Sequence, residues 1–180
     1  MTEPRRANAI GLRLGACCLG IFLAASLQAQ EAGTGDAMEQ DAEVSICFNY
    51  RCLSQEKVRI EAWRLDAILR TLGEAENAGE ERRRLAAAIG ALYAIAAEQT
   101  PVGNDRGGNY ADAGVFGRMD CIDHSTTTTR FLRLLAERGG LRWHRVLEPA
   151  RRTRFWVAQH FSAVIEENGA PEDGALAASS

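Results

Sequence analysis

A cysteine and a histidine in this chain have the types and surroundings that nucleophilic chemistry requires. Cys121 directly follows Asp120, a natural helix N-cap, at the expected start of a helix. A cysteine in the first turn lies beside backbone N–H groups without intrahelical partners and at the positive end of the helix dipole, and both favour the thiolate. His160 lies on an expected strand at residues 155–166. A thiolate beside an imidazole base can attack a carbonyl carbon, so Cys121 and His160 are the predicted catalytic pair.

Structural roles explain the same residues as well. A cysteine at a helix start also packs as a small hydrophobe, and His160 can be a satisfied histidine on a strand. We interpret His144 as structural and Asp123 as a helix-start charge. The residues alone leave these alternatives open.

Two further cysteines, Cys47 and Cys52, are spaced as expected for a protein in an oxidising compartment. Cys47 and Cys52 are close enough in sequence to close a small loop in an oxidising environment, and we predict a disulfide between them. The alternative is a pair of buried free thiols. Neither cysteine has a second Cys or a His at ligand spacing, so no metal site is predicted. A disulfide leaves Cys121 as the single free thiol of the exported chain.

Residues 1–30 have the pattern of a secretory signal peptide. Three arginines precede an uncharged apolar run at residues 14–27, and small residues follow it. The run is shorter than the roughly 20 residues that span a bilayer. The alternatives are an uncleaved anchor, or lipidation at Cys17, for which the apolar run lies on the wrong side. We expect a periplasmic or secreted protein with no stable membrane insertion after signal removal.

Hydrophobic periodicity after the signal predicts an α+β domain, with N-terminal helices followed by an antiparallel sheet. We expect a disordered linker at residues 31–43, the domain at 44–167 and a disordered tail at 168–180. The Glu80–Arg84 run is expected at the solvated front of its helix. The expected elements are strands at 44–50 and 58–60, helices at 61–72, 75–98 and 121–138, a Gly-rich loop at 101–117, and strands at 141–147 and 155–166 joined by a hairpin connection at 148–154.

Composition limits the function classes. The chain has 21 Lys and Arg against 24 Asp and Glu, which is not the basic excess of a nucleic-acid-binding protein. Its 46% hydrophobic residues fit an ordinary globular domain rather than a disordered chain. No cofactor-binding motif stands out, so no cofactor is predicted, and the sequence gives no oligomeric state.

Several segments resemble the transglutaminase-like cysteine peptidases of bacteria, in particular a group of exported proteobacterial proteins. The resemblance lies in residues 117–123 with the following helix, 141–146 and 160–166, and it spans roughly 44–167. The paired Cys47 and Cys52, Trp63 and the charged start of the long helix also fit. The resemblance implies that Cys121 and His160 are the first two members of a Cys-His-Asp triad.

The third member departs from that pattern. The family places an Asp on a further strand, whereas only 13 residues follow Glu167 and Asp173 fits no strand pattern. Glu166 shares a face with His160 but lies about 20 Å along the strand. His124 stands where an acidic residue is usual. The chain therefore reads as truncated, divergent or inactive.

Two hypotheses follow. The first is an exported cysteine hydrolase or acyltransferase acting on amide bonds of a peptide or cell-envelope substrate, with backbone N–H groups at the helix start holding the oxyanion. The second is an inactive envelope scaffold or interaction domain.

Overall fold

The computed structural model describes residues 40–106, 114–154 and 158–169, and within them the protein is α+β. The predicted signal peptide, most of the predicted linker and the predicted tail from residue 170 lie outside the described residues. The three predicted helices are confirmed with ends shifted by a few residues. The elements are β1 (Ala42–Phe48), β2 (Ser54–Ile60), α1 (Ala62–Gly73), α2 (Ala78–Gln99), the 3-10 helix η1 (Pro101–Asn104), α3 (Cys121–Glu137), β3 (His144–Arg154) and β4 (Ala158–Glu167).

The strands form two separate antiparallel ribbons, β1–β2 and β3–β4, rather than one sheet after the helices. In the first ribbon, Val44, Ile46 and Phe48 point into the core, as their alternation predicts. β1 begins at Ala42, inside the segment predicted as linker, because Ala42 is itself buried and pairs with Ile60. Pairing with β1 also lengthens the second strand, which begins at Ser54.

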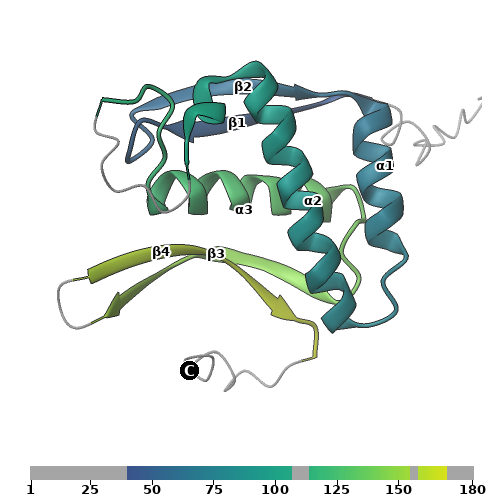
Figure 1. The fold of residues 1–180 in the computed structure, drawn as a ribbon. Coiled ribbons are helices and arrows are strands. Elements are labelled where there is room, and N and C mark those ends of the chain that lie inside the picture. Colours follow the sequence, from purple (N-terminus) through teal and green to yellow (C-terminus); the bar gives the residue numbers. More distant parts are fainter. Residues whose placement is uncertain (1–39, 107–113, 155–157, 170–180) are drawn as a thin grey trace, which may run out of the picture. The chain divides into compact units, whose positions relative to one another are not determined.

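Helix α3 packs against both ribbons, so it is the central element between them (Figure 1). Its Phe131 and Leu135 are fully buried. The threonine run also has a packing role: buried Thr127 accepts a hydrogen bond from the N–H of Cys47 on β1 (3.0 Å). A hydroxyl facing the ribbon thus satisfies a buried backbone donor that an aliphatic side chain would leave unpaired.

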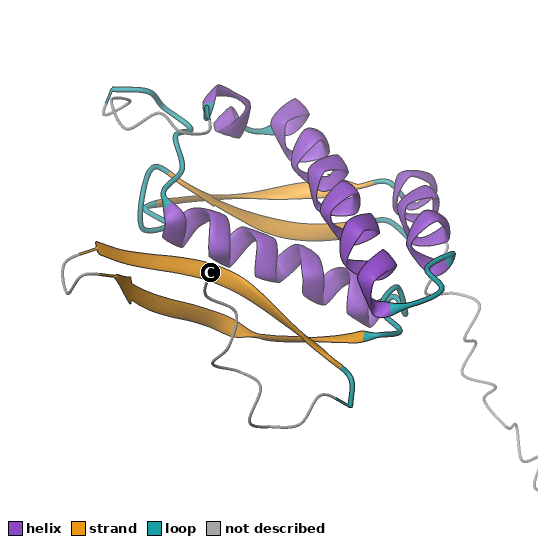
Figure 2. Cartoon of the chain, turned by 60° about the horizontal axis from the view of Figure 1, so that its bottom comes forward, coloured by secondary structure: helices purple, strands orange, loops and turns teal. Residues whose placement is uncertain are grey.

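Helices α1 and α2 complete the core through the apolar stripes predicted from the sequence. Leu65, Leu69 and Leu72 of α1 are buried with Leu85 and Leu92 of α2. α2 contacts α1, β2 and α3 (Figure 2). Among the described residues, the structure contains no helix that is both long and apolar enough to cross a membrane.

The connection between β3 and β4 is shorter than predicted. Residues 148–154, predicted as a hairpin connection, belong to β3, which runs to Arg154. The pairing register shifts between Leu147 and Ala150, where β3 carries Pro149. Such a shift absorbs a residue that cannot donate to the ladder, so the strand continues past the proline. Residues 155–157 at the ribbon's end lie outside the described part.

Glu81 corrects the prediction that the charged run at the start of α2 is solvated. Its side chain is fully buried and accepts hydrogen bonds from the N–H groups of Arg142 (2.7 Å) and Trp143 (3.1 Å). His144 Nδ1 lies 2.8 Å from the same carboxylate, and Arg82 lies 3.1 Å from His144 Nε2. Because a guanidinium only donates, Nε2 accepts and Nδ1–H donates to Glu81. His144 is therefore structural, as predicted.

We expect Glu81→Gln to lower the free energy of unfolding at pH 7 by about 1–3 kcal/mol, since buried donors lose a charged acceptor. Burial raises the pKa of the Glu81 carboxyl, but hydrogen bonds from Arg142, His144 and Trp143 outweigh it and hold the pKa below its usual 4.5. The stabilisation by ionised Glu81 is therefore complete above the unfolded-state pKa and is lost as the pH falls through the lower folded value.

Urea unfolding between pH 7 and pH 3 tests this prediction. The difference between wild type and Glu81→Gln should shrink towards acid pH, whereas Glu56→Gln on an exposed side chain should stay close to wild type throughout. A difference that does not change with pH would contradict the assigned role of Glu81.

Candidate functional site

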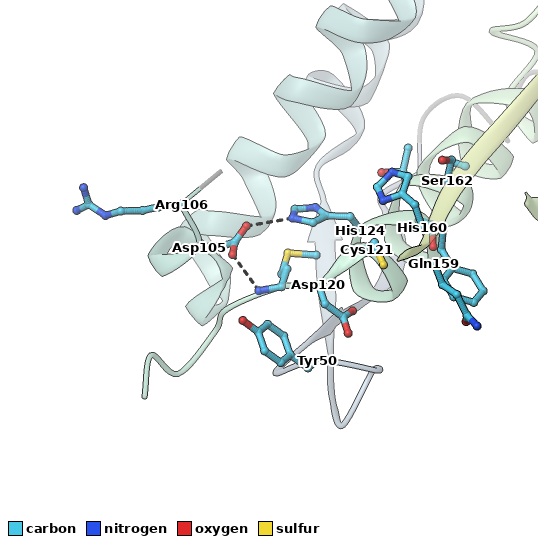
Figure 3. Close-up of a pocket in the computed structure, with 14 residues that line it drawn as sticks. Tyr50, Asp105, Arg106, Asp120, Cys121, His124, Gln159, His160 and Ser162 are labelled. Atoms are coloured by element: carbon cyan, nitrogen blue, oxygen red, sulfur yellow. Dashed lines mark hydrogen bonds and ion pairs between the residues drawn. The ribbon is translucent and has the colours of Figure 1, made fainter. Parts of the chain in front are cut away.

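Cys121 and His160, 39 residues apart in sequence, line the same pocket (Figure 3). The pocket has a volume of about 740 Å³ and lies between the start of α3, the segment after η1 and the first half of β4. Cys121 is a half-buried free thiol at the first position of α3. His160 is exposed on β4, where it pairs with Arg152 of β3. The fold therefore brings the predicted pair to one cavity.

The start of α3 is capped more completely than the sequence suggests. Asp120 accepts hydrogen bonds from the N–H groups of Ile122 and Asp123, both at 2.9 Å, and Asp123 accepts one from the N–H of Asp120. This is a capping box. The prediction that these N–H groups are unpaired and hold an oxyanion is corrected for Ile122 and Asp123, because the Asp120 carboxylate occupies both. The N–H of Cys121 itself is not bonded to that carboxylate.

The turn between β1 and β2 is hydrogen-bonded to the start of α3. Asn49, Tyr50, Arg51 and Cys52 all have φ between 54° and 66°, a left-handed conformation that costs roughly 1–2 kcal/mol per residue outside glycine. Their N–H groups converge on α3: those of Tyr50 (2.8 Å) and Cys52 (2.6 Å) donate to Asp123, and that of Arg51 donates to Asp120. The two carboxylates therefore offset the strain of the turn.

The predicted disulfide holds the same turn closed. The sulfurs of Cys47, near the end of β1, and Cys52, the last residue of the left-handed segment, are at bonding distance. The segment before α3 is also attached to this turn: Gly117 donates to the Asn49 side chain and Asn49 donates to the carbonyl of Arg118. Gly117 has φ +97° and packs so closely on Pro101 that a Cβ would overlap its carbonyl. The segment before Cys121 and the helix that begins with it are therefore both attached to the β1–β2 turn, and this fixes the position of Cys121.

Asp123 is the carboxylate that accepts the hydrogen bonds of Tyr50 and Cys52 at this junction of the turn with α3. Its side chain is fully buried, although the sequence indicated only a helix-start charge. Burial raises the pKa of its carboxyl, the Asp120 charge adds to the effect, and hydrogen bonds from the N–H groups of Asp120, Cys52 and Tyr50 oppose it. The Asp123 carboxylate therefore holds the turn against the start of α3, and it does not line the pocket.

No carboxylate orients His160 among the residues that the structure describes. Its ring forms no hydrogen bond or ion pair there, and Glu166, the acidic residue on the same face of β4, is paired with Arg145 across the ribbon. The missing third member of the predicted triad is therefore not supplied by another described residue of the same chain.

A second histidine in the pocket does have a carboxylate partner. His124 Nε2 lies 3.1 Å from Asp105, whose other oxygen accepts the N–H of Met119 at 2.9 Å. In Figure 3 the His124 ring is directed towards Asp105. The sequence signal for His124 was its place one helical turn after Cys121. Asp105 carried no signal, because it lies in an irregular segment without periodicity.

The pocket thus contains a thiol and two imidazoles beside both polar and apolar residues of β4, and the thiol with the imidazoles is suited to nucleophilic attack and proton transfer. Thr128, which lines the pocket, is hydrogen-bonded to Tyr93 (3.1 Å), and burial raises the pKa of Tyr93 to about 12, so that it stays a neutral hydroxyl. Within the described segments, no group of three or more His, Cys, Asp or Glu side chains is arranged to hold a metal ion.

Comparison of the chain with protein-family models, with curated proteins and with solved structures finds no match.

Proposed function

We propose that the protein is an exported transglutaminase-like cysteine hydrolase or acyltransferase that acts on amide bonds, with Cys121 as nucleophile and His160 as base. The observation that carries this proposal is the shared pocket of about 740 Å³, which a free thiol at a helix start and a strand histidine line together. Export fits the Cys47–Cys52 disulfide, which persists in oxidising compartments.

The reaction has two steps. The Cys121 sulfur attacks the amide carbonyl carbon while His160 takes the thiol proton and passes it to the leaving amine, which gives a thioester. Water or a second amine then attacks the thioester and releases the thiol. The N–H of Cys121 is the helix-start donor that remains to face the developing oxyanion. Peptide chains of the cell envelope are the substrate class that fits an exported enzyme of this kind.

A second candidate function is an envelope interaction domain without turnover. Two observations favour it: His160 has no carboxylate partner among the described residues, and the Asp120 carboxylate occupies two of the N–H groups at the start of α3. A loosely held imidazole loses catalytic rate because its tautomer and orientation are not fixed.

An acylation experiment tests the proposed function. Protein incubated with p-nitrophenyl acetate should gain one acetyl group by intact mass, mapped to Cys121, and hydroxylamine should remove it. Cys121→Ser should gain none at that position. Hydrolysis of fluorescein-labelled casein by wild type but not by Cys121→Ser would then establish turnover on amides. A wild-type chain that is never acylated at Cys121 would leave the interaction domain as its function.

A further inference from the structure

The two outer edges of the β3–β4 ribbon differ in how they are protected from other strands. β3 carries Pro149, a register shift and the exposed Arg151 and Arg152. Proline, irregular pairing and charge are the devices by which natural edge strands avoid pairing with another chain. Among the described residues, β4 pairs with β3 alone, and its residues 159–165 contain no Pro, Gly, Lys, Arg, Asp or Glu. Within the described residues, the outer edge of β4 is therefore unpaired and uncharged and contains no proline.

The edge of β4 is complementary to itself. Ala163 and Ile165 pack against the core, so a second copy that continues the sheet with its core on the same side must pair residues of equal parity. A two-fold axis on any residue of β4 meets this condition, and the axis at Ala163 is chosen for the pairs that it forms. It places Phe161 opposite Ile165 of the second copy, an aromatic–β-branched pair of the kind that stabilises sheets. It also places His160 opposite Glu166 of the second copy.

This register supplies the site with a carboxylate. Residues directly opposite each other in an antiparallel pair have Cβ atoms about 4.5–5.5 Å apart. Glu166 of the second copy would thus reach His160, whereas Glu166 of the same chain lies about 20 Å along the strand. Within its own chain Glu166 forms an ion pair with Arg145 across the ribbon, which restricts the position of its carboxylate, and its side chain is 19% exposed.

We propose that two copies of the chain pair antiparallel through the free edges of β4 about Ala163, so that Glu166 of each copy orients His160 of the other. The interface stands independently of the proposed function, while the orienting role of Glu166 rests on it.

Light scattering during size exclusion tests the interface. The chain should elute at twice its 19.6 kDa. Ser162→Lys places one lysine of each copy on either side of the two-fold axis, as diagonal neighbours across the new strand pair, and should yield a monomer. Thr153→Lys, the matched substitution on β3, should stay dimeric. Circular dichroism checks that both variants are folded. A monomeric wild type, or a dimer that Ser162→Lys leaves intact, would overturn the interface.

Disulfide cross-linking tests the register. With Cys17, Cys18 and Cys121 replaced by Ser, the His160→Cys/Glu166→Cys double variant should form a covalent dimer on oxidation. Each single variant should stay uncross-linked, because like positions are then about 20 Å apart. A dimeric double variant that does not cross-link would contradict this register.

Mixing two variants tests the role of Glu166 in the site. His160→Ala and Glu166→Gln should each be slow in acylation, and a mixture after subunit exchange should recover about a quarter of the wild-type rate, since only half of the dimers are mixed and each restores one site. Cross-linking without recovery would refute the orienting role and leave the interface. An unreactive wild type that still cross-links would refute the proposed function alone.

Discussion

Replacing His160 by Ala is expected to slow acylation of Cys121 by p-nitrophenyl acetate by about a hundredfold, the lower range of what a positioned general base contributes. Both residues line the same pocket, and in the proposed mechanism the His160 imidazole takes the thiol proton. Stopped-flow release of p-nitrophenol at pH 7 measures the rate, and iodoacetamide alkylation of Cys121 should slow in parallel.

Two further variants make this result specific. Gln159→Ala removes the neighbouring pocket side chain on β4 and should keep the rate within about threefold of wild type, because the amide has no part in proton transfer. His124→Ala removes the histidine that Asp105 holds. A large loss in His124→Ala with none in His160→Ala would move the base to α3 and show that the predicted pair is wrong. No loss in either variant would indicate a packed, structural thiol at position 121.

Asp123→Ala is expected to lower the free energy of unfolding by about 3–5 kcal/mol, because three backbone N–H groups lose a charged acceptor. Those donors belong to Tyr50, Cys52 and Asp120. With the carboxylate gone, the left-handed turn keeps its strain without the bonds that offset it. A loss of this size is a large share of the stability of an ordinary domain. Urea unfolding followed by circular dichroism measures it.

The matched controls are Asp123→Asn and Asp120→Ala. Asparagine keeps one acceptor oxygen and should lose less than alanine. Asp120 is only partly buried and is bonded to the N–H groups of Ile122, Asp123 and Arg51, so its removal should cost about 1–2 kcal/mol, as for a helix cap. An Asp123→Ala variant as stable as wild type would show that the turn does not depend on this carboxylate.

The local elements could be predicted from the sequence because their signals are local. Apolar residues at helical spacing placed α1, α2 and α3, and Asp120 before Cys121 marked the start of α3. Alternating apolar residues at positions 44, 46 and 48 predicted β1, and the short spacing of Cys47 and Cys52 indicated their disulfide. Each of these depends on neighbours within a few positions of the chain.

The errors have a common physical origin in contacts between distant segments. Glu81 looked like one charge of a solvated run, yet it sits on the stripe of Leu85 and Leu92 and meets backbone donors more than 60 positions away. Pro149 looked like the end of a strand, but the register shift lets β3 continue past it. The two separate ribbons followed from α3 packing between them, which no local pattern records.

For the candidate site, the sequence by itself determined the chemical types: a free cysteine at a helix start and a histidine on a later strand. Only the tertiary structure decided that Cys121 and His160 share one pocket, that Asp105 holds His124, and that Asp123 is used up by the turn at residues 49–52. The reason is physical. A helix cap is set by residues next to each other in the chain, whereas the partner of a buried carboxylate or an imidazole is whichever donor the packed core brings within 3 Å, and that depends on every element at once.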